Sequence, residues 1–309
     1  MTSHTFPVAL LRQNSYDPAS LRAGVDSLFA ACGIAFARGE SVLVKPNLVS
    51  RANAGLSCTH PQVVGAVCAH LLDCGARPLV ADSPAFGSAE RVAAACGLPE
   101  MLRPLGLMVR TLGRPAPLGL PCGGSIGLSR HALEADRIIS VGKLKAHGQF
   151  RVTAATKNLF GCVCGCRKAH AHMRLGGQPG GMERMVLAVR AALPPTVGLV
   201  DAVVAMHRGG PIHGQPYPLG LLAAVPNTLA LDAALYALRG LCPAQVPLWA
   251  EAQAQNLPGA GCGEARFVLE PPEHFDAAGF ALSPELDPMR FEPVRFLRGR
   301  LKSLLHRVT

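Results

Sequence analysis

The sequence has few aromatic residues, few charged residues and no long hydrophobic run. Phe, Tyr and Trp make up 5% of its 309 residues, which excludes a core of stacked rings, so the interior has to be built mostly from Ala, Val, Leu and Ile. No apolar run reaches the ~18 residues that a membrane-spanning helix requires. The basic residues are not interleaved with aromatic side chains, as a single-strand nucleic-acid platform requires, which argues against nucleic acid as a partner.

Acidic residues are also scarce. The chain has 20 Asp and Glu against 30 Lys and Arg, a net charge of +10 that favours anionic partners such as phosphates, acidic metabolites or a lipid surface. The first residues lack a charged segment followed by a long apolar stretch, so we expect no signal peptide and a cytoplasmic location. In that reducing compartment the eleven cysteines are expected to be free or metal-bound. Four fall in apolar helical patterns and are expected to be small buried hydrophobes: Cys32, Cys68, Cys74 and Cys96.

Apolar runs alternate with helical patterns along the chain, and hydrophobic residues make up 49% of it. This alternation is typical of an α/β protein with a mostly parallel sheet flanked by helices. We expect the α/β region to span residues 1–270, either as one unit or as two lobes around a crevice that divide near residue 142. Residues 271–309, which are rich in proline and charge, are expected to form a basic C-terminal appendage.

Polar side chains follow four of the expected strands at the point where each strand ends. The strands are expected at 41–44, 78–81, 137–141 and 196–200, and the polar residues are Lys45, Asn47, Asp82, Lys143, Lys145, His147 and Asp201. In an open parallel sheet the ligand crevice lies outside the carboxyl ends of the strands. We therefore expect these side chains to converge on one site. The alternative is that turns are simply polar.

The segment from Lys143 to His172 is the most informative part of the sequence. It holds six Lys and Arg, three His and three Cys, and it contains no Asp or Glu. Burying that many unpaired cations as ordinary core would cost several kcal/mol each, and an exposed face normally mixes both charge signs. The segment therefore indicates a site for an anion, a metal or a cluster.

Two motifs in this segment suit an anionic ligand. The KLKAH motif places Lys143, Lys145 and His147 on one face of an extended chain, where they suit a carboxylate or a phosphate. If burial removed the proton from one lysine, the same residues would suit proton transfer. The TKNLFG motif places Lys157 and Asn158 shortly before a glycine that allows close approach of a ligand. The alternative for KLKAH is a solvated strand end.

The CVCGC motif is followed closely by two histidines. Its three cysteines lie on one side if the chain is extended, and neighbouring cations, including Lys168, favour thiolate over thiol. The candidate ligands of an iron–sulfur cluster or another metal are Cys162, Cys164, Cys166, His170 and His172. The spacing differs from the C-x-x-C that zinc and iron–sulfur sites more often use, so reactive thiols and no role at all are the alternatives.

The THPQVV motif marks the start of a helix. Thr59 is the expected N-cap, with a proline in the first turn. A helix N-terminus can also hold an anion, so Thr59 and His60 are candidate ligand-binding residues. A structural cap alone is the alternative.

The last twenty residues are strongly basic. Six Arg and Lys oppose a single Glu there, and apolar residues recur between them at helical spacing. A basic amphipathic helix of this kind can lie on an anionic membrane, which would place the protein at the inner face of the membrane. Packing against the body of the protein is the alternative.

The chain resembles the domain-of-unknown-function 362 family in a series of motifs that occur in the same order: KPNLVS, THPQVV, ADSP, SRHALEADRIISVGKLKAH, TKNLFG, GCRKAHAH and VDAVVAM with a following GGP. The resemblance covers about residues 5–260. Many members carry a ferredoxin-like run of cysteines and are labelled iron–sulfur proteins for that reason, and this chain has no such run. It also has Cys164 where a proline is common and His207 where many relatives have an acid. In layout and in Lys and His content the family is similar to lactate-racemase-type proteins, which hold a nickel-pincer nucleotide with lysine and histidines.

Three functions compete at this point. The first is a redox-related iron–sulfur or other metal protein that acts on an anionic ligand. The second is a non-redox enzyme for an acidic or phosphorylated small molecule, with isomerase- or epimerase-like chemistry in which Lys145 or His147 is the acid or base and Asp82 its orienting partner. The third is a membrane-associated assembly factor. The expected ligand site combines Lys45, Asn47, Thr59, His60, Asp82, Lys143, Lys145, His147, Lys157, Asn158, Lys168 and Asp201, together with His172.

Overall fold

The computed structural model describes residues 5–84, 87–121, 123–165, 167–283 and 285–287. Its elements follow one another in the order β1 (Phe6–Arg12), α1 (Pro18–Ala31), β2 (Ser41–Pro46), α2 (Ala54–Ser57), α3 (Pro61–Asp73), β3 (Arg77–Asp82), α4 (Ala89–Cys96), α5 (Leu98–Leu102), η1 (Arg103–Leu105), β4 (Val109–Thr111), β5 (Pro115–Gly119), β6 (Ser125–Ser129), α6 (Arg130–Leu133), β7 (Arg137–His147), β8 (Arg151–Thr153), α7 (Ala155–Asn158), η2 (Leu159–Cys162), α8 (Arg167–Leu175), α9 (Gly181–Ala192), β9 (Thr196–His207), β10 (Gln215–Tyr217), β11 (Leu221–Val225), α10 (Thr228–Leu238), η3 (Pro243–Gln245), α11 (Pro247–Ala254), β12 (Ala265–Phe267) and η4 (Pro272–His274). The expected C-terminal amphipathic helix falls in residues 288–309, outside the described residues.

A ten-stranded sheet forms the centre of the protein, with the main order β12-β1-β11-β9-β7-β2-β3-β4. From β9 through β7, β2 and β3 to β4, every neighbouring pair is parallel. β11 and β1 continue the sheet antiparallel beyond β9, and β12 pairs parallel with β1. The short strands β8 and β10 pair antiparallel with β7 and β9, and β5 and β6 form a separate hairpin. The expected α/β fold with a mostly parallel sheet flanked by helices is therefore confirmed.

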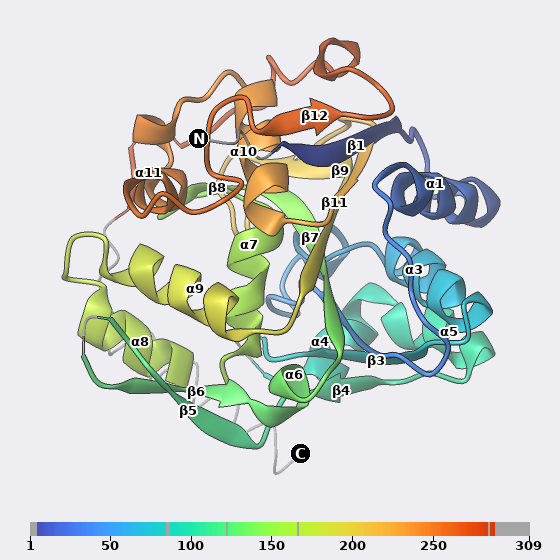
Figure 1. Ribbon diagram of the computed structural model, residues 1–309, viewed down its shortest axis with the longest axis horizontal. Coiled ribbons are helices and arrows are strands. Elements are labelled where there is room, and N and C mark those ends of the chain that lie inside the picture. The colour runs from blue at the N-terminus through green and yellow to red at the C-terminus, as the bar shows by residue number, and fades with distance from the viewer. Residues whose placement is uncertain (1–4, 85–86, 122, 166, 284, 288–309) are drawn as a thin grey trace.

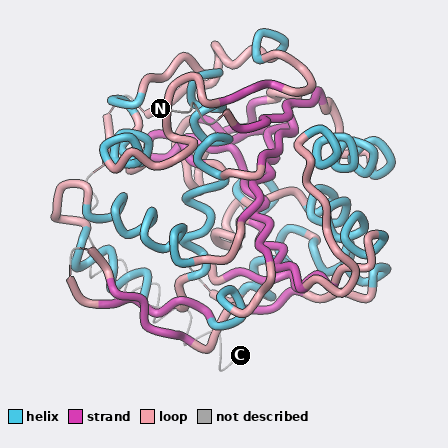
Figure 2. The backbone as a smooth tube through the Cα atoms, in the orientation of Figure 1, coloured by secondary structure: helices cyan, strands magenta, loops and turns pink. Residues whose placement is uncertain are grey.

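Helices cover both faces of the sheet (Figures 1 and 2). In Figure 1, α1, α3 and α5 lie on one side of the strands, called here the α3 side, and α7, α8 and α9 lie on the other, called the α9 side. The strands alternate accordingly: in β2, Val42 and Val44 belong to the core on the α3 side, and Leu43 belongs to the core on the α9 side. Burial of both faces explains why the central strands are continuous apolar runs in the sequence.

Helix starts follow the expected signals in one case and depart from them in another. Asn227 caps α10 by accepting hydrogen bonds from two backbone amides of the first turn, and Gly240 follows the helix end with a φ of 74°. The cap of α3 is His60 rather than Thr59, because the His60 side chain accepts a hydrogen bond from the amide of Gln62 at 3.2 Å. Thr59 is thereby left to bond elsewhere.

The chain continues without a break at three expected boundaries. Residue 142 lies inside β7, which pairs with both β2 and β9, so the sheet does not divide there. Asp201 lies within β9 rather than at its end, because that strand continues alongside β10. Phe275 and Phe280, in the region expected to be an appendage, are buried in the core on the α9 side.

The four cysteines that are expected to be buried differ in their exposure to solvent. Cys32 and Cys68 are buried, whereas Cys74 and Cys96 are partly exposed. Burial of the first pair matches the apolar helical patterns in which these residues occur. Within the described residues, no helix combines the length and the apolar character needed to cross a bilayer.

Candidate functional site

Two buried ion pairs lie at the carboxyl-terminal half of the central strands. Lys45, which follows Leu43 on the α9 side of β2, pairs with Asp82 at the end of β3, with 2.7 Å between Nζ and Oδ1. Lys143 of β7 pairs with Asp201 of β9, with 2.8 Å between Nζ and Oδ2. All four side chains are at most 2% exposed. Charges this deeply buried are tolerated when they are paired and hydrogen-bonded, so each carboxylate is already committed to one lysine.

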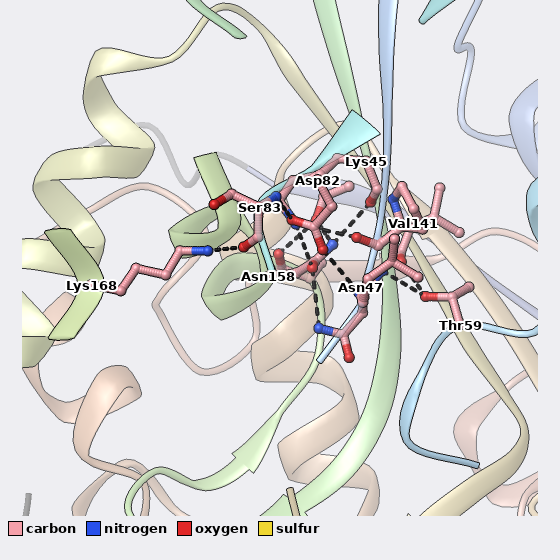
Figure 3. A network of polar contacts seen from close by, with 12 residues as sticks. Lys45, Asn47, Thr59, Asp82, Ser83, Val141, Asn158 and Lys168 are labelled. Carbon is pink, nitrogen blue, oxygen red and sulfur yellow. Dashed lines mark hydrogen bonds and ion pairs between the residues drawn. The ribbon is translucent and has the colours of Figure 1, made fainter. Parts of the chain in front are cut away.

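Hydrogen bonds from several elements fix the Lys45–Asp82 pair (Figure 3). The Lys45 ammonium donates to Asn158 Oδ1 at 2.9 Å, and Asn158 Nδ2 donates back to the Lys45 carbonyl at 3.0 Å. Asp82 accepts hydrogen bonds from the backbone amides of Leu48 and Ser83 at 2.9 and 2.8 Å. These contacts join β2, β3 and α7 at one point, which holds the pair rigidly.

A tyrosine and a histidine surround the Lys143–Asp201 pair. Tyr16 donates from its hydroxyl to Asp201 Oδ1 at 3.0 Å and accepts from Lys143 Nζ at 3.1 Å. The Tyr16 ring stacks on the ring of His60, with 3.6 Å between the centroids. Burial raises the pKa of Tyr16 and lowers the pKa of His60, so both side chains are neutral. No sequence motif pointed to Tyr16, which lies in a loop 185 residues before Asp201.

Asn47 and Lys145 extend the hydrogen-bonded network of the Lys45–Asp82 pair. Asn47 Nδ2 donates to Asn158 Oδ1 at 3.3 Å, and its Oδ1 accepts a short hydrogen bond from Lys145 Nζ. Lys145 also donates to the carbonyl of Ser57 at 2.9 Å. Thr59 supports this bridge, because its hydroxyl donates to a β7 carbonyl at 2.7 Å and accepts from the Asn47 amide at 2.9 Å. The end of β2 is therefore joined by hydrogen bonds to α7 and to β7.

Lys145 is 3% exposed and has no carboxylate partner within the part of the chain that the structure describes. Both of its acceptors are neutral oxygen atoms. Its pKa is lowered from 10.5 to about 7, mainly by burial and also by the charges of Lys157 and Lys143, while Cys58 and Asp82 oppose the decrease. A lysine with this pKa exchanges its proton near neutral pH, which an arginine cannot do.

Lys157 and Lys168 add two further cations beside this network. Lys157 is half-buried, and its ammonium lies 5.0 Å from the centre of the Phe150 ring. Among the described residues it has no hydrogen-bond or ion-pair partner. Lys168 reaches from α8 to the carbonyl of Ser83 (Figure 3). The pKa of each lysine is lowered to about 8, mainly by burial. The charges of Lys168 and Lys45 contribute to the decrease for Lys157, and Asp82 opposes the decrease for Lys168.

The site collects nearly all of the lysine in the chain. Lys accounts for only six of the 30 Lys and Arg residues, and every lysine except Lys302 belongs to the site. The five are called here the lysine cluster: Lys45, Lys143, Lys145, Lys157 and Lys168. Arginine, which supplies the cations elsewhere, does not lose its proton in proteins. This uneven use of Lys and Arg is a sequence signal that identifies the cluster without any motif.

His147 is a neutral hydrogen-bond donor rather than a base. Its Nδ1 accepts hydrogen bonds from the two backbone amides at 149 and 150, at 3.1 and 3.4 Å, which leaves the proton on Nε2. Burial lowers its pKa well below the ordinary value. Asp82, expected to orient Lys145 or His147, is bonded instead to Lys45, because β2 and β3 are direct neighbours and their ends meet.

The described residues do not fit a metal centre. No three His, Cys, Asp or Glu side chains among them are arranged to hold a metal ion. Cys162 and Cys164 are buried, and burial raises the pKa of both thiols, that of Cys162 to about 12. The expectation that nearby cations would produce thiolates is therefore wrong for these two, since the loss of water outweighs the attraction. His170 is exposed, His172 packs on an aromatic ring, and Cys166 lies outside the described residues.

Known proteins similar to this chain place it in a family. The sequence model for the family described as a domain of unknown function (DUF362) matches residues 42–237. A thylakoid-associated protein of Synechocystis sp. is 35% identical over 300 residues, which cover 96% of this chain and 93% of the relative.

Two solved structures are more distant matches. The lactate racemase apoprotein from Thermoanaerobacterium thermosaccharolyticum is 12% identical, with a TM-score of 0.43 over 65% of this chain and 52% of that one. A protein from Thermotoga maritima is 15% identical, with a TM-score of 0.45 over 70% of this chain and 57% of that one. The chain thus spans a little over half the length of these structures. The family model and the Synechocystis relative, which carry the assignment, show that this chain belongs to the DUF362 family.

Proposed function

We propose that the protein binds a small molecule bearing a carboxylate or a phosphate at the lysine cluster, and that Lys145 transfers a proton to or from that molecule. The observation that carries this proposal is the gathering of five of the six lysines around two carboxylates, each of which is already paired. Three ammonium groups, those of Lys145, Lys157 and Lys168, lack a carboxylate among the described residues. An anionic ligand supplies the missing charge.

The proton-transfer role rests on the environment of Lys145. Its pKa of about 7 means that the charged and neutral forms are both populated at neutral pH, which is the condition that general acid–base catalysis requires. His147 carries a proton on Nε2 and is suited to donate a hydrogen bond to an oxygen that gains negative charge. The chemistry that fits is removal and return of a proton beside an anionic group, as in an isomerase or epimerase.

Anion binding is tested by the thermal unfolding temperature in inorganic phosphate, malate and chloride at matched ionic strength. We expect phosphate or malate to raise the unfolding temperature above its value in chloride, because a ligand that binds the folded state stabilises it. Lys157→Gln should lose this increase. Arg103→Gln, which removes an exposed charge from η1, is the matched control and should keep it. An equal response to all three salts would rule out an anion site.

Proton transfer is tested by incubating the protein with short hydroxy and amino acids in D2O and following deuterium incorporation beside the carboxylate by NMR. We expect exchange with at least one of these probes. Lys145→Arg should abolish it, because arginine keeps the charge and cannot release the proton. Exchange that survives in Lys145→Arg, or no exchange with any probe, contradicts the proposed role.

The competing hypothesis is a redox-related iron–sulfur or other metal centre at the CVCGC motif. It predicts metal bound in proportion to the protein after anaerobic purification, and loss of that metal in Cys162→Ser. The acid–base proposal predicts no such metal. The raised pKa values of the Cys162 and Cys164 thiols favour the acid–base proposal, because metal ligation requires thiolates.

A second candidate function is attachment to a membrane surface. The Synechocystis relative is named as thylakoid-associated, and residues 290–309 of this chain carry six Arg and Lys with one Glu. Basic segments of this kind bind anionic lipid. In this proposal the tail brings the lysine cluster to a membrane, and the acid–base chemistry is unchanged.

A further inference from the structure

Cys74, His70 and Asp26 form a linked array of side chains on the α3 side of the protein. His70 and Cys74 stand one turn apart at the end of α3, and Asp26 belongs to α1, the helix beside it (Figure 1). The sulfur of Cys74 lies 3.7 Å from His70 Nε2, and His70 Nδ1 lies 2.6 Å from Asp26 Oδ1. Thiol, imidazole and carboxylate therefore follow one another in the order that an activated nucleophile requires.

The carboxylate decides which nitrogen of the imidazole ring carries the proton. An ionised carboxylate only accepts hydrogen bonds, so His70 Nδ1 donates to Asp26. In the neutral ring, Nε2 is then the acceptor, and it faces the sulfur of Cys74. The lone pair of Nε2 is thus in place to take the proton of the thiol.

The imidazole ring is held from several directions. Arg22 donates from Nε to both oxygens of Asp26, at 3.0 and 3.1 Å, which fixes the carboxylate. The rings of Phe29 and Phe36 meet the His70 ring edge-on, with 5.0 and 5.9 Å between the centroids. The His70 side chain is only 14% exposed. A ring that is packed and hydrogen-bonded in this way keeps Nε2 directed at the sulfur.

Cys74 is accessible from solvent, and a second cysteine offers a matched comparison. Cys74 and Cys96 are both partly exposed, and each stands at the C-terminal end of a helix. The sulfur of Cys96 bonds to the backbone carbonyl of Ala93 at 3.2 Å, and a carbonyl does not take a proton from a thiol. Cys74 differs from Cys96 by having a base beside an accessible sulfur.

The backbone around Cys74 favours attack on a disulfide over acyl transfer. An acyl-transfer site needs free amides to hold the developing oxyanion. The amides of Cys74, Gly75 and Ala76 are already bonded to carbonyls of the last turns of α3, at 3.1, 2.9 and 2.9 Å respectively. Disulfide exchange needs only a thiolate and forms no oxyanion, so it is the chemistry that this surface supports.

We propose that Cys74 is a modification site at which a low-molecular-weight disulfide transfers one of its halves to the protein. The sulfur of Cys74 attacks one sulfur of the reagent as His70 Nε2 takes the thiol proton. The sulfur–sulfur bond of the reagent breaks, and the departing thiolate recovers that proton from His70. The cysteine is oxidised to a mixed disulfide, and half of the reagent is reduced to a free thiol. Asp26 is a positioning residue, because it acts through His70.

This site is separate from the lysine cluster. α3 begins beside the cluster, where the His60 amide donates to Asp201 at 3.0 Å, and it ends at Cys74. At about 1.5 Å per residue, the two ends of the helix lie roughly 20 Å apart. The modification of Cys74 therefore does not depend on the function proposed for the lysine cluster.

The test follows the reaction of the full chain with bis(2-hydroxyethyl) disulfide at neutral pH. Samples are quenched with acid, the free thiols are alkylated, and the hydroxyethyl adducts on Cys74 and Cys96 are quantified by mass spectrometry of peptides. We expect the Cys74 adduct to form faster than the Cys96 adduct by a factor on the order of 100, as general base catalysis provides. Because both rates come from one sample, the reagent and the state of the protein are the same for both.

Two variants separate base catalysis from access to the sulfur. His70→Gln cannot take a proton, so it should lower the Cys74 rate to that of Cys96, with the Cys96 rate and the Trp249 fluorescence unchanged. Asp26→Asn should lower the Cys74 rate by a smaller factor. At about pH 10 a thiol ionises without a base, since its ordinary pKa is about 8.5, and all three proteins should then react at similar rates.

Three outcomes would overturn the proposal. The first is an equal rate at Cys74 and Cys96 in the parent protein. The second is a Cys74 rate that His70→Gln leaves unchanged at neutral pH. The third is a difference between the parent and His70→Gln that persists at about pH 10, because it would show that His70 controls access rather than the proton. Failure of deuterium exchange at the lysine cluster bears on the proposed function alone.

Discussion

Replacing Lys145 by methionine should stabilise the protein at neutral pH. Lys145 holds a charge in a buried position without a carboxylate partner among the described residues, and burial lowers its pKa from 10.5 to about 7. The folded state therefore binds this proton more weakly than the unfolded chain does. Methionine has a similar length and no charge, so it removes the penalty while filling the same space.

The size of the effect follows from the pKa. At about 1.4 kcal/mol per pKa unit, the buried charge destabilises the folded state by roughly 4 kcal/mol at pH 7. The variant also loses hydrogen bonds to Asn47 Oδ1 and to the Ser57 carbonyl, each worth about 1 kcal/mol. We expect a net stabilisation of about 2 kcal/mol at pH 7.

The sign of the pH dependence is fixed by the same pKa. Because the folded pKa lies below the unfolded one, the unfolded chain binds more protons between pH 7 and 10.5, and the stability of the parent protein rises with pH through this window. The advantage of Lys145→Met should therefore be greatest below pH 7, vanish at about pH 9, where the electrostatic gain only matches the lost hydrogen bonds, and turn into a loss of stability near pH 10.5.

The assay is urea unfolding at pH 7 and at pH 10, followed by the fluorescence of Trp249, the only tryptophan of the chain. Lys143→Met is the matched control, since this lysine lies two residues earlier on β7 and pairs with Asp201 at 2.8 Å. Removing one partner of a buried pair costs about 3–5 kcal/mol, so the control should be destabilised. If Lys145→Met were destabilised to the same extent at both pH values, the ammonium of Lys145 would have an effective partner and the reasoning would be wrong.

Three further predictions concern other parts of the chain. Gly161→Ala should destabilise the protein by about 1–3 kcal/mol in urea unfolding, because the added methyl group would lie against Asp82 Oδ1 and Lys45 Nζ. The control Gly55→Ala, at a position with open space around it, should change the stability by less. Equal losses in the two variants would contradict the crowding argument. Burial raises the pKa of Asp232 from 3.8 to about 6. The free energy of unfolding of the parent protein should therefore fall by up to about 3 kcal/mol relative to that of Asp232→Asn as the pH rises from 4 to 7. A difference in unfolding free energy that stays constant over this range would show that the carboxyl group is not buried as described. Deletion of residues 288–309 should abolish co-sedimentation with anionic liposomes at low salt, because each deleted cation contributes about 1 kcal/mol of attraction to the anionic surface. Equal recovery of the full-length and the truncated protein with anionic and neutral liposomes, at low and high salt, would exclude the membrane role.

Much of the central sheet and of the site could be predicted because parallel strands follow simple rules. Their two-sided burial produces uninterrupted apolar runs, and their carboxyl ends share one edge. The positions of Lys45, Asp82 and Lys143 follow from these rules. Asp201 is expected at the end of its strand, but β9 continues beyond it alongside β10. Nothing in the sequence indicates this continuation.

The pairings within the site could not be predicted from the sequence. Which lysine Asp82 binds depends on the order of β2 and β3 in the sheet, and Tyr16 enters the site only because the loop before α1 passes over β9. The thiolate expected at Cys162 is not supported for a related reason. The nearby cations can be read from the sequence, whereas the extent of burial, which raises the pKa of this thiol, cannot.

The position of β1 has a consequence for how the chain is made. Ala9 pairs with Ala224, and Phe6 pairs with Ala265, so the first strand lies between two of the last ones. The strands β2, β3 and β7 are complete long before either neighbour of β1 has been synthesised. At a ribosomal rate of about 5–20 residues per second, β1 waits on the order of 10–40 s for its partners. During that interval its apolar residues have to be kept from aggregating, and the antiparallel half of the sheet closes only when synthesis is nearly complete.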